Sequence, residues 1–217
     1  MSQKPIIGIT MGDPASIGPE IAVKALLNKE IYEICRPLIV GDAGVITDIT
    51  KKLGLKAEIH AIKNVEEAKF NLGDIEVFDL ANVDLEQLQF GEVSAMAGNA
   101  AFQADKKVID LALAGEIDAT VTGPINKKSI NDAGHHFAGH TEIYAHYTGT
   151  NKYAMLLVED HLKVIHVSTH VSLRQACDLV KKDRILEVVH LLHNGLQQLG
   201  ETNLKIGIAG LNPHAGD

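Results

Sequence analysis

The sequence contains no tryptophan, and aromatic residues make up only 4% of its 217 residues. Cysteine is also scarce, with only Cys35 and Cys177, and these two form no C-x-x-C pair. A chain of this length does not depend on one disulfide, so the cysteine content favours a reducing compartment and predicts a cytoplasmic protein. No stretch approaches the roughly 20 apolar residues of a membrane span, and the amino-terminal segment lacks the apolar run of a signal peptide.

Basic residues are outnumbered, with 20 Lys and Arg against 28 Asp and Glu and a formal net charge of −8 at pH 7. Nucleic acids and anionic membrane surfaces bind basic protein faces, so we expect neither kind of partner. An anionic small-molecule substrate is still compatible, because the local charge of a pocket can oppose the net charge. The 46% hydrophobic and 22% charged residues indicate a globular chain rather than a disordered one.

Two common nucleotide-binding motifs are missing. The dinucleotide pattern G-x-G-x-x-G does not occur. In "GDPASIGPE", the spacing of Gly12 and Gly18 and the lack of a following Lys-Ser/Thr exclude a P-loop. Pro19 suits the first turn of a helix. This segment is therefore either a tight strand-to-helix turn or a helix start that faces an anion or a polar substrate.

Apolar runs alternate with helical patterns along the chain. The predicted strands are residues 5–10, 36–42, 57–62, 75–80, 118–124, 153–159, 162–168 and 204–210. The predicted helices are residues 21–27, 43–55, 94–115, 173–180 and 184–200. This alternation predicts an α/β fold with a mostly parallel sheet that helices cover on both sides. Ligands bind beyond the carboxyl ends of strands in such folds, which selects the loops after Thr10, Thr122, Ser168 and Gly210.

Local signals predict several helix ends. Gly115 lies where the C-cap of the long helix 94–115 belongs. Ser172 and Gln175 form a capping box for helix 173–180, and Asp183 is a candidate cap for helix 184–200.

Two lysines follow a predicted strand in "TGPINKK" and begin a helix. On one interpretation both are ordinary lysines exposed to solvent. On a second interpretation one of them holds a phosphate or assists proton transfer. On the second interpretation, Lys127 is the candidate catalytic residue.

Histidines gather around "AGHTEIYAHYTG". His140 and Thr141 lie where a helix starts, so their donors and acceptors could face a ligand. We expect His135 and His136 to lie on the loop surface.

His166 and His170 form an H-x-x-x-H pattern, but the segment reads as a strand running into a loop. Side chains four residues apart on a strand are about 13 Å apart, too far for two ligands that are each about 2.1 Å from one metal. At most one of the two therefore ligates a metal, and His170, at the strand end, is the better candidate. His166 is expected in the core or on a sheet face. His214 also follows a predicted strand, so it could share a metal with His170.

Five segments, in this order, resemble the motif series of the 4-hydroxythreonine-4-phosphate dehydrogenase family: "ITMGDPASIGPE", "TGPINK", "GHTEIYA", "STHVSLR" and "GLNPHAGD". The resemblance implies an isocitrate/isopropylmalate dehydrogenase-like fold with two α/β lobes and mostly parallel sheets. The first lobe would span residues 1–135, and residues 136–217 would form part of the second. Family members are about half as long again, so the resemblance implies a chain truncated at its carboxyl end.

The resemblance also implies roles for single residues. His140 and Thr141 would contact the substrate. His170 and His214 would bind a divalent zinc, magnesium or cobalt ion, with a third histidine ligand in the absent carboxyl-terminal part. His166 matches no ligand of the family pattern.

The implied activity is metal-dependent oxidation of 4-phosphooxy-L-threonine by NAD or NADP, with decarboxylation, towards pyridoxal phosphate, in a homodimer with shared active sites. One alternative is the related D-threonate or D-erythronate 4-phosphate dehydrogenase branch, which "YAMLLVEDHLKVIHVSTHVSLR" resembles more closely. Two further alternatives are a phosphate acyltransferase-like protein, a class that uses a related fold without a metal, and an inactive fragment. Much of the dinucleotide site would lie in the absent part, so we expect residues 1–217 alone to be inactive.

Overall fold

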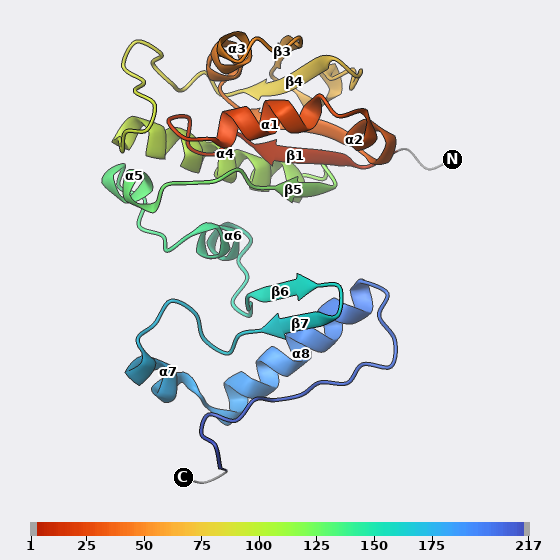
Figure 1. Cartoon of the computed structure of the whole chain (residues 1–217), viewed down its shortest axis with the longest axis vertical. Helices are drawn as coiled ribbons and strands as arrows, with labels where there is room; N and C mark the ends of the chain where they lie inside the picture. Colours follow the sequence, from red (N-terminus) through yellow and green to blue (C-terminus); the bar gives the residue numbers. More distant parts are fainter. Residues whose placement is uncertain (1–3, 215–217) are drawn as a thin grey trace. The chain divides into compact units, whose positions relative to one another are not determined.

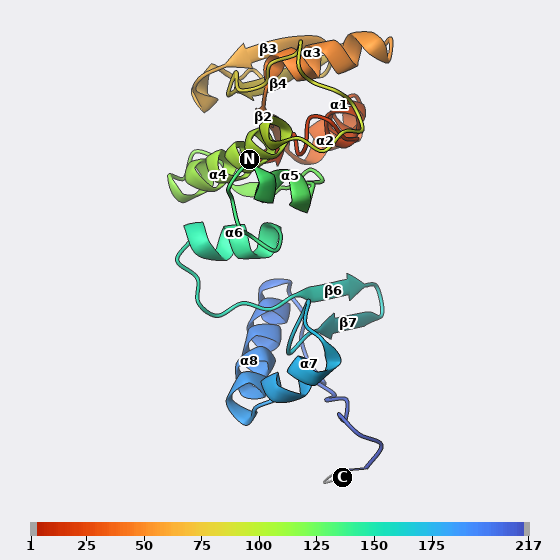
Figure 2. The same ribbon diagram turned by 90° about the vertical axis from the view of Figure 1, so that its left-hand side faces the viewer.

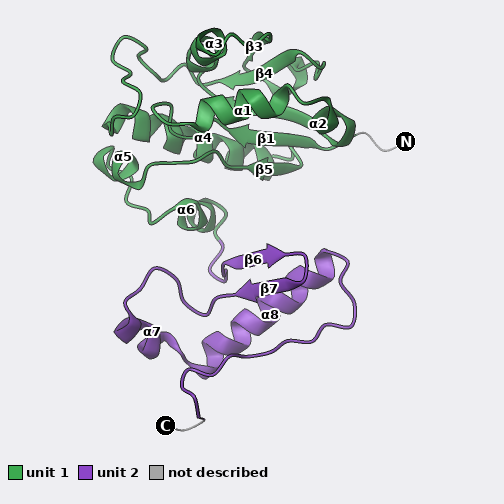
Figure 3. Ribbon diagram, viewed as in Figure 1, with its two compact units in different colours: residues 1–149 green, residues 150–217 purple. Residues whose placement is uncertain are grey.

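The computed structural model describes residues 4–214, and the chain divides into two compact units, residues 1–149 and 150–217 (Figures 1 and 3). The predicted division of the complete fold into lobes near residue 135 stays a prediction. Within residues 4–214, no helix combines the length and the apolar character that crossing a membrane requires.

The first unit is built on a five-stranded sheet in the order β3-β4-β2-β1-β5 (Figure 1). Its strands are β1 (Ile6–Thr10), β2 (Arg36–Gly41), β3 (Glu58–Ile62), β4 (Asp74–Asp79) and β5 (Ala119–Val121). Every neighbouring pair is parallel. The predicted parallel α/β sheet is therefore confirmed for this unit.

Four helices and one 3₁₀ turn at Val65–Glu67 connect these strands, and two more helices follow β5. The helices are α1 (Gly18–Leu26), α2 (Lys29–Ile34), α3 (Ala43–Lys52), α4 (Ala95–Leu113), α5 (Lys127–Asp132) and α6 (His140–Tyr147).

Both faces of the sheet are buried, which explains the continuous apolar run of β2. Successive side chains of a strand point to opposite faces. Ile39 accordingly packs in one apolar cluster with Val23 of α1 and Val45 of α3. Leu38 packs in a second cluster with Val108 of α4. The sheet thus lies between α1 and α3 on one side and α4 on the other.

Helix α4 has a defined start and end. The Ser94 side chain accepts a hydrogen bond from the amide of Ala97. At the other end Gly115 has φ +74°, and its amide donates to Ala112 while that of Glu116 donates to Leu111. This is a Schellman motif, and it confirms the C-cap predicted at Gly115.

The second unit contains an antiparallel hairpin of β6 (Leu156–Glu159) and β7 (Leu162–Ile165). Two helices follow, α7 (Leu173–Leu179) and α8 (Lys182–Gln198), and α8 lies alongside the hairpin (Figure 2). The predicted strand pair is confirmed, as is the capping box of Ser172 and Gln175.

Two sequence predictions for this unit are wrong. Helix α8 begins at Lys182 with Lys181 as its N-cap, so Asp183 lies inside the first turn and is no cap. Residues 204–210 form no strand, and Ile208 is 68% exposed. A segment with alternating apolar residues forms a strand only where a neighbouring strand can pair with it. Within residues 150–214, the sheet contains only β6 and β7, and neither pairs with residues 204–210.

Candidate functional site at the carboxyl ends of β1 and β5

The loops that follow β1 and β5 come together, because the two strands are neighbours in the sheet. Thr10 ends β1, and its buried hydroxyl accepts a hydrogen bond from the amide of Gly123 at 2.9 Å. The amide of Asp13 donates to the carbonyl of Pro124, also at 2.9 Å. Two of the four loops selected from the sequence, those after Thr10 and Thr122, are therefore joined at one edge of the sheet.

Glycine makes this close approach possible. Gly12 has φ +73°, and a Cβ at this position would lie 2.5 Å from the carbonyl oxygen of Pro124. A Cβ at Gly123 would lie 2.5 Å from the carbonyl oxygen of Thr10. Any larger residue at either position would separate the loops or strain the backbone.

The "GDPASIGPE" segment forms a tight turn into α1. Asp13 is 1% exposed, and its Oδ1 accepts a hydrogen bond from the amide of Ala15 at 2.8 Å. Burial raises the pKa of the Asp13 carboxyl, and the Ala15 amide partly offsets this. The hollow beside the turn, about 400 Å³, is lined by three acids, Asp13, Glu20 and Glu92, and by no lysine or arginine among the described residues. The acidic lining favours the tight-turn interpretation over an anion site at the start of α1.

A buried acid and a histidine lie side by side behind these loops. Asp105 of α4 is fully buried, and its Oδ2 is 3.5 Å from Nε2 of His140, the first residue of α6. Neither carboxylate oxygen of Asp105, nor Nε2 of His140, has a hydrogen-bond partner of good geometry within residues 4–214. A buried polar pair with unmet hydrogen-bonding capacity is typical of a functional position.

Burial controls the ionisation of this pair. It raises the pKa of Asp105 to about 7, with the nearby Thr10 hydroxyl partly offsetting the effect. It lowers the pKa of His140, which a backbone contact with Gly123 partly offsets. Near neutral pH, His140 is therefore mostly uncharged, and Asp105 can gain or lose its proton in this range. The pair can hold or pass a proton, and it differs in this from a fixed ion pair.

Tyr144, one turn after His140, ties α6 to the sheet. Its hydroxyl donates a hydrogen bond to Oγ1 of Thr120 at 2.9 Å. Burial raises the pKa of Tyr144, and the Asp105 carboxylate raises it further, so the phenol stays protonated. This contact fixes the position from which His140 projects.

Lys127 and Thr141 lie near the start of α6, where His140 is the first residue. Lys127 begins α5, where the Asn126 side chain caps the helix by accepting from the amide of Ser129. A Cβ at Gly139 would lie 3.8 Å from Cε of Lys127, so the lysine stem runs beside the start of α6. Thr141 follows His140 and is half-buried. We call Thr10, Asp105, Lys127, His140 and Thr141 the carboxyl-end cluster.

The two lysines of "TGPINKK" differ in their surroundings. Lys128 forms an ion pair with Asp132 at 2.5 Å. Lys127 is exposed and has no carboxylate partner within residues 4–214. The ammonium group of Lys127 is therefore the one available to an anionic ligand.

The second unit carries the two predicted metal ligands. His170 lies in the loop between β7 and α7, is exposed, and has a left-handed backbone with φ +58°. His214 is exposed at the end of the described residues. Because residues 204–210 form no strand, the prediction that His214 follows a strand is wrong. Their shared coordination of a metal stays a prediction. His166 follows β7 directly and is half-buried.

His135 lies in the loop as predicted but is half-buried, so the prediction that it lies on the surface is only partly correct. Its ring stacks on Phe102 with 3.6 Å between the centroids, and its Nε2 is 3.0 Å from Oδ1 of Asn99. An apolar neighbour from α4, distant in sequence, thus half-buries the ring. His136 is exposed, as predicted.

Sequence reasoning missed Asp105, although a signal for it existed. Asp105 lies four residues after Ala101 and three before Val108, a helical spacing that puts all three on one face of α4, and both apolar residues are buried. An acidic residue on such a face is either paired or perturbed.

Comparison with known proteins places the chain in a family. Residues 33–217 match the family model described as pyridoxal phosphate biosynthetic protein PdxA. A relative from Symbiobacterium thermophilum, provisionally named a D-threonate 4-phosphate dehydrogenase, is 45% identical over all 217 residues, and one of the same name from Clostridium botulinum is 43% identical. The chain spans 65% of the length of these curated relatives.

Solved structures agree with this assignment. A 4-hydroxythreonine-4-phosphate dehydrogenase from Klebsiella pneumoniae is 40% identical, with a TM-score of 0.88 over 99% of this chain and 65% of that one. One from Burkholderia phymatum has a TM-score of 0.85 at 39% identity, over 99% of this chain and 65% of that one. A terephthalate 1,2-cis-dihydrodiol dehydrogenase from Burkholderia xenovorans aligns over 99% of this chain and 64% of its own, with a TM-score of 0.65 at 28% identity. The match of the family model across most of the chain, together with this structural agreement, makes the protein a member of the PdxA family.

Proposed function

We propose that this chain carries the substrate-contacting part of a dehydrogenase that oxidises the secondary alcohol of a phosphorylated four-carbon hydroxy acid, with D-threonate 4-phosphate as the first candidate substrate. The observation that carries the proposal is the buried Asp105–His140 pair at the joined ends of β1 and β5, beside the available Lys127. The name of the two curated relatives supports this substrate.

A second candidate substrate is 4-phosphooxy-L-threonine, which carries an amine where threonate carries a hydroxyl. The names of the solved structures at 39% and 40% identity support it. Oxidation of either substrate at its third carbon gives a ketone β to the carboxylate, which can then lose carbon dioxide. In this second case the product would serve pyridoxal phosphate synthesis.

In this proposal His140 and Thr141 hydrogen-bond the substrate. The uncharged His140 ring can accept the proton that the alcohol releases, and the partly ionised Asp105 can stabilise the imidazolium that results. The electron pair leaves the substrate as a hydride, and NAD or NADP is the acceptor we propose. Lys127 supplies positive charge for the phosphate or the carboxylate.

His170 and His214 are the residues that would hold a divalent cation, and their solvent-exposed imidazoles suit an ion such as zinc or cobalt. Such an ion, when bound, acts as a Lewis acid that lowers the pKa of a ligated alcohol. We also propose a homodimer, which is supported by the exposed apolar side chains Leu157, Val158 and Leu162 on the hairpin.

Binding tests the substrate role of residues 1–217 directly. We expect D-threonate 4-phosphate to bind the chain in isothermal titration calorimetry, and His140→Ala to weaken binding at least tenfold. The matched control, His136→Ala, changes an exposed histidine four residues away and should leave the affinity unchanged. Equal affinities for the two variants would contradict the assigned role of His140.

Activity is tested with a protein that continues this chain to the length of its relatives. We expect cofactor reduction, followed at 340 nm, with D-threonate 4-phosphate and NAD or NADP, and loss of the signal with a chelator or with His170→Ala. A faster rate with 4-phosphooxy-L-threonine would select the second candidate. If neither substrate reduces either cofactor, the proposed dehydrogenase activity is wrong.

A further inference from the structure

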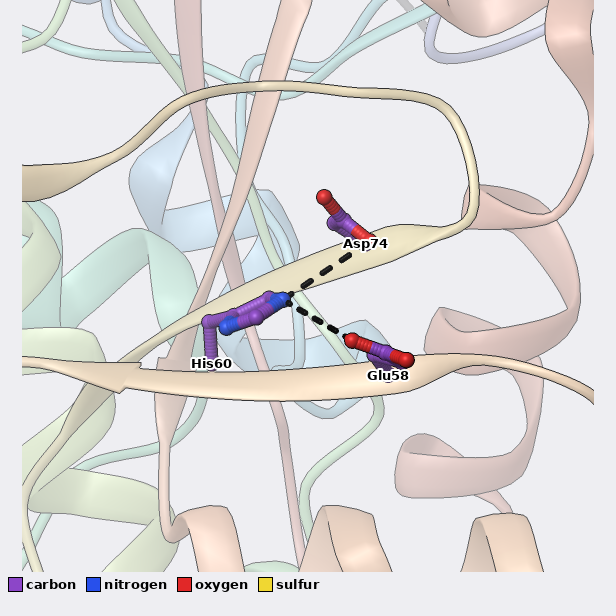
Figure 4. Close-up of side chains that lie close together, drawn as sticks. All are labelled: Glu58, His60 and Asp74. Atoms are coloured by element: carbon purple, nitrogen blue, oxygen red, sulfur yellow. Dashed lines mark ion pairs between the residues drawn. The ribbon is translucent and has the colours of Figure 1, made fainter.

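Three potential metal ligands gather at the amino ends of β3 and β4 (Figure 4). Glu58 and His60 are two residues apart on β3, so their side chains share one face of the sheet. Asp74 begins β4 and pairs with Glu58 in the parallel register. Nε2 of His60 is 3.8 Å from Oε2 of Glu58 and 3.7 Å from Oδ1 of Asp74. One ligand atom from each residue lies within 4.8 Å of the other two.

These separations are too long for hydrogen bonds but suit atoms that share a cation. Nitrogen and oxygen ligands lie about 2.1 Å from zinc, so tetrahedral to trigonal angles separate two ligands by roughly 3.4 to 3.6 Å. Nε2 of His60 is also covered from solvent and has no hydrogen-bond partner within residues 4–214. A covered nitrogen that faces two carboxylates without a hydrogen bond to either is unsatisfied unless something lies between them.

A residue outside the trio orients one ligand. The Asn71 side-chain amide donates to Oδ2 of Asp74 at 3.2 Å, which leaves Oδ1 directed at His60. Outer-shell hydrogen bonds of this kind fix ligating carboxylates in metal sites.

The surroundings are acidic and lack a compensating cation. Glu76, which pairs with His60 in the register, is 2% exposed, and its Oε1 accepts from the amides of Lys69 and Phe70. Among residues 4–214, no lysine or arginine forms an ion pair with Glu58 or Asp74.

We propose that Nε2 of His60, Oε2 of Glu58 and Oδ1 of Asp74 bind a divalent cation of the zinc class, with water in the fourth position. One imidazole and two carboxylates suit zinc or cobalt better than magnesium, which prefers six oxygen ligands. The ion would bridge the edge strand β3 to β4. It lies at the amino ends of the strands, whereas the carboxyl-end cluster lies at the opposite ends of β1 and β5. The site is therefore structural and independent of the proposed dehydrogenase activity.

The test uses the 217-residue chain with His170→Ala and His214→Ala, which removes the other predicted ligands. We expect calorimetric titration with Zn²⁺ to show one equivalent bound, and Co²⁺ to give visible absorption bands of low-coordinate cobalt. Adding His60→Ala should weaken binding at least tenfold and abolish the rise in the unfolding midpoint caused by Zn²⁺. Adding His193→Ala, at an exposed histidine of α8, is the matched control and should change neither.

Glu58→Gln provides a second variant that keeps the fold, because the Glu58 side chain is 81% exposed. It should also weaken Zn²⁺ binding while leaving the circular dichroism spectrum unchanged. Absence of a bound equivalent overturns the proposal, as does equal Zn²⁺ affinity after His60→Ala.

Discussion

Removing the ionisable group of Asp105 should change how the stability of the first unit depends on pH. Asp105 is fully buried, and burial raises its pKa from 3.8 to about 7. Between these two values the folded state holds a proton that the unfolded state has lost. Stability therefore falls as pH rises through this interval, and it is constant with respect to this group below about 4 and above about 7.

The magnitude follows from the size of the pKa change. Each pKa unit corresponds to 1.36 kcal/mol, so ionised Asp105 costs the folded state on the order of 4 kcal/mol at pH 8, of which about 3 kcal/mol develops between pH 5 and pH 8. Asp105→Asn replaces the carboxyl with a neutral group of the same shape. We therefore expect the free energy of unfolding of this variant, measured relative to that of the original chain, to increase by about 3 kcal/mol from pH 5 to pH 8.

Urea unfolding at pH 5 and pH 8, followed by probes in residues 1–149, measures this difference. Asp110→Asn is the matched control on the same helix, because the carboxylate of Asp110 is 46% exposed and pairs with Lys106. An exposed pair of this kind contributes about 0.2 to 1 kcal/mol, so the control should show little pH dependence. Two results would contradict a raised pKa of Asp105. One is a difference in unfolding free energy between Asp105→Asn and the original chain that is the same at both pH values. The other is a ¹³C signal of the Asp105 carboxyl that titrates near 4.

Three further changes test other parts of the structure. Gly12→Ala, with a Cβ 2.5 Å from a carbonyl oxygen, should cost about 2 kcal/mol or more in urea unfolding. Gly134→Ala, also at positive φ but with open space around it, should cost only about 1 kcal/mol, and equal costs would argue against the loop contact. Lys127→Ala should lower the affinity for D-threonate 4-phosphate, measured by titration calorimetry, at least fivefold. A comparable loss in Lys128→Ala would show that the effect comes from net positive charge and not from the position of Lys127. Ser172→Ala should cost about 1 kcal/mol at the start of α7 and speed amide exchange there, and unchanged exchange would show that the cap is dispensable.

Some elements of this protein were predictable because their signals are local. The apolar run at residues 36–42 predicted a strand, and the structure places β2 inside a parallel sheet, where its residues are buried. The Gly115 C-cap and the Ser172 capping box were also predictable, because each involves only a few consecutive residues. The order of the motifs from Thr10 to Asp217 was sufficient to predict the family.

Other features depend on neighbours far away in the chain, which periodicity does not reveal. The half-buried stacking of His135 requires Phe102, and the perturbed pKa of Asp105 results from its burial beside α6 and β1. The strand predicted at residues 204–210 is wrong for the same reason. The alternation of apolar residues indicates which side chains would share a face, but it does not show whether a partner strand is present.

By itself, the sequence determined the parallel α/β organisation of residues 4–149, the local helix caps and the PdxA family, because the residues that carry these properties are contiguous or recur in a fixed order. Only the tertiary structure decided that Asp105 faces His140, and that Glu58 and His60 face Asp74. The physical reason is that distance, burial and ionisation are set by which strands and helices become neighbours in the fold.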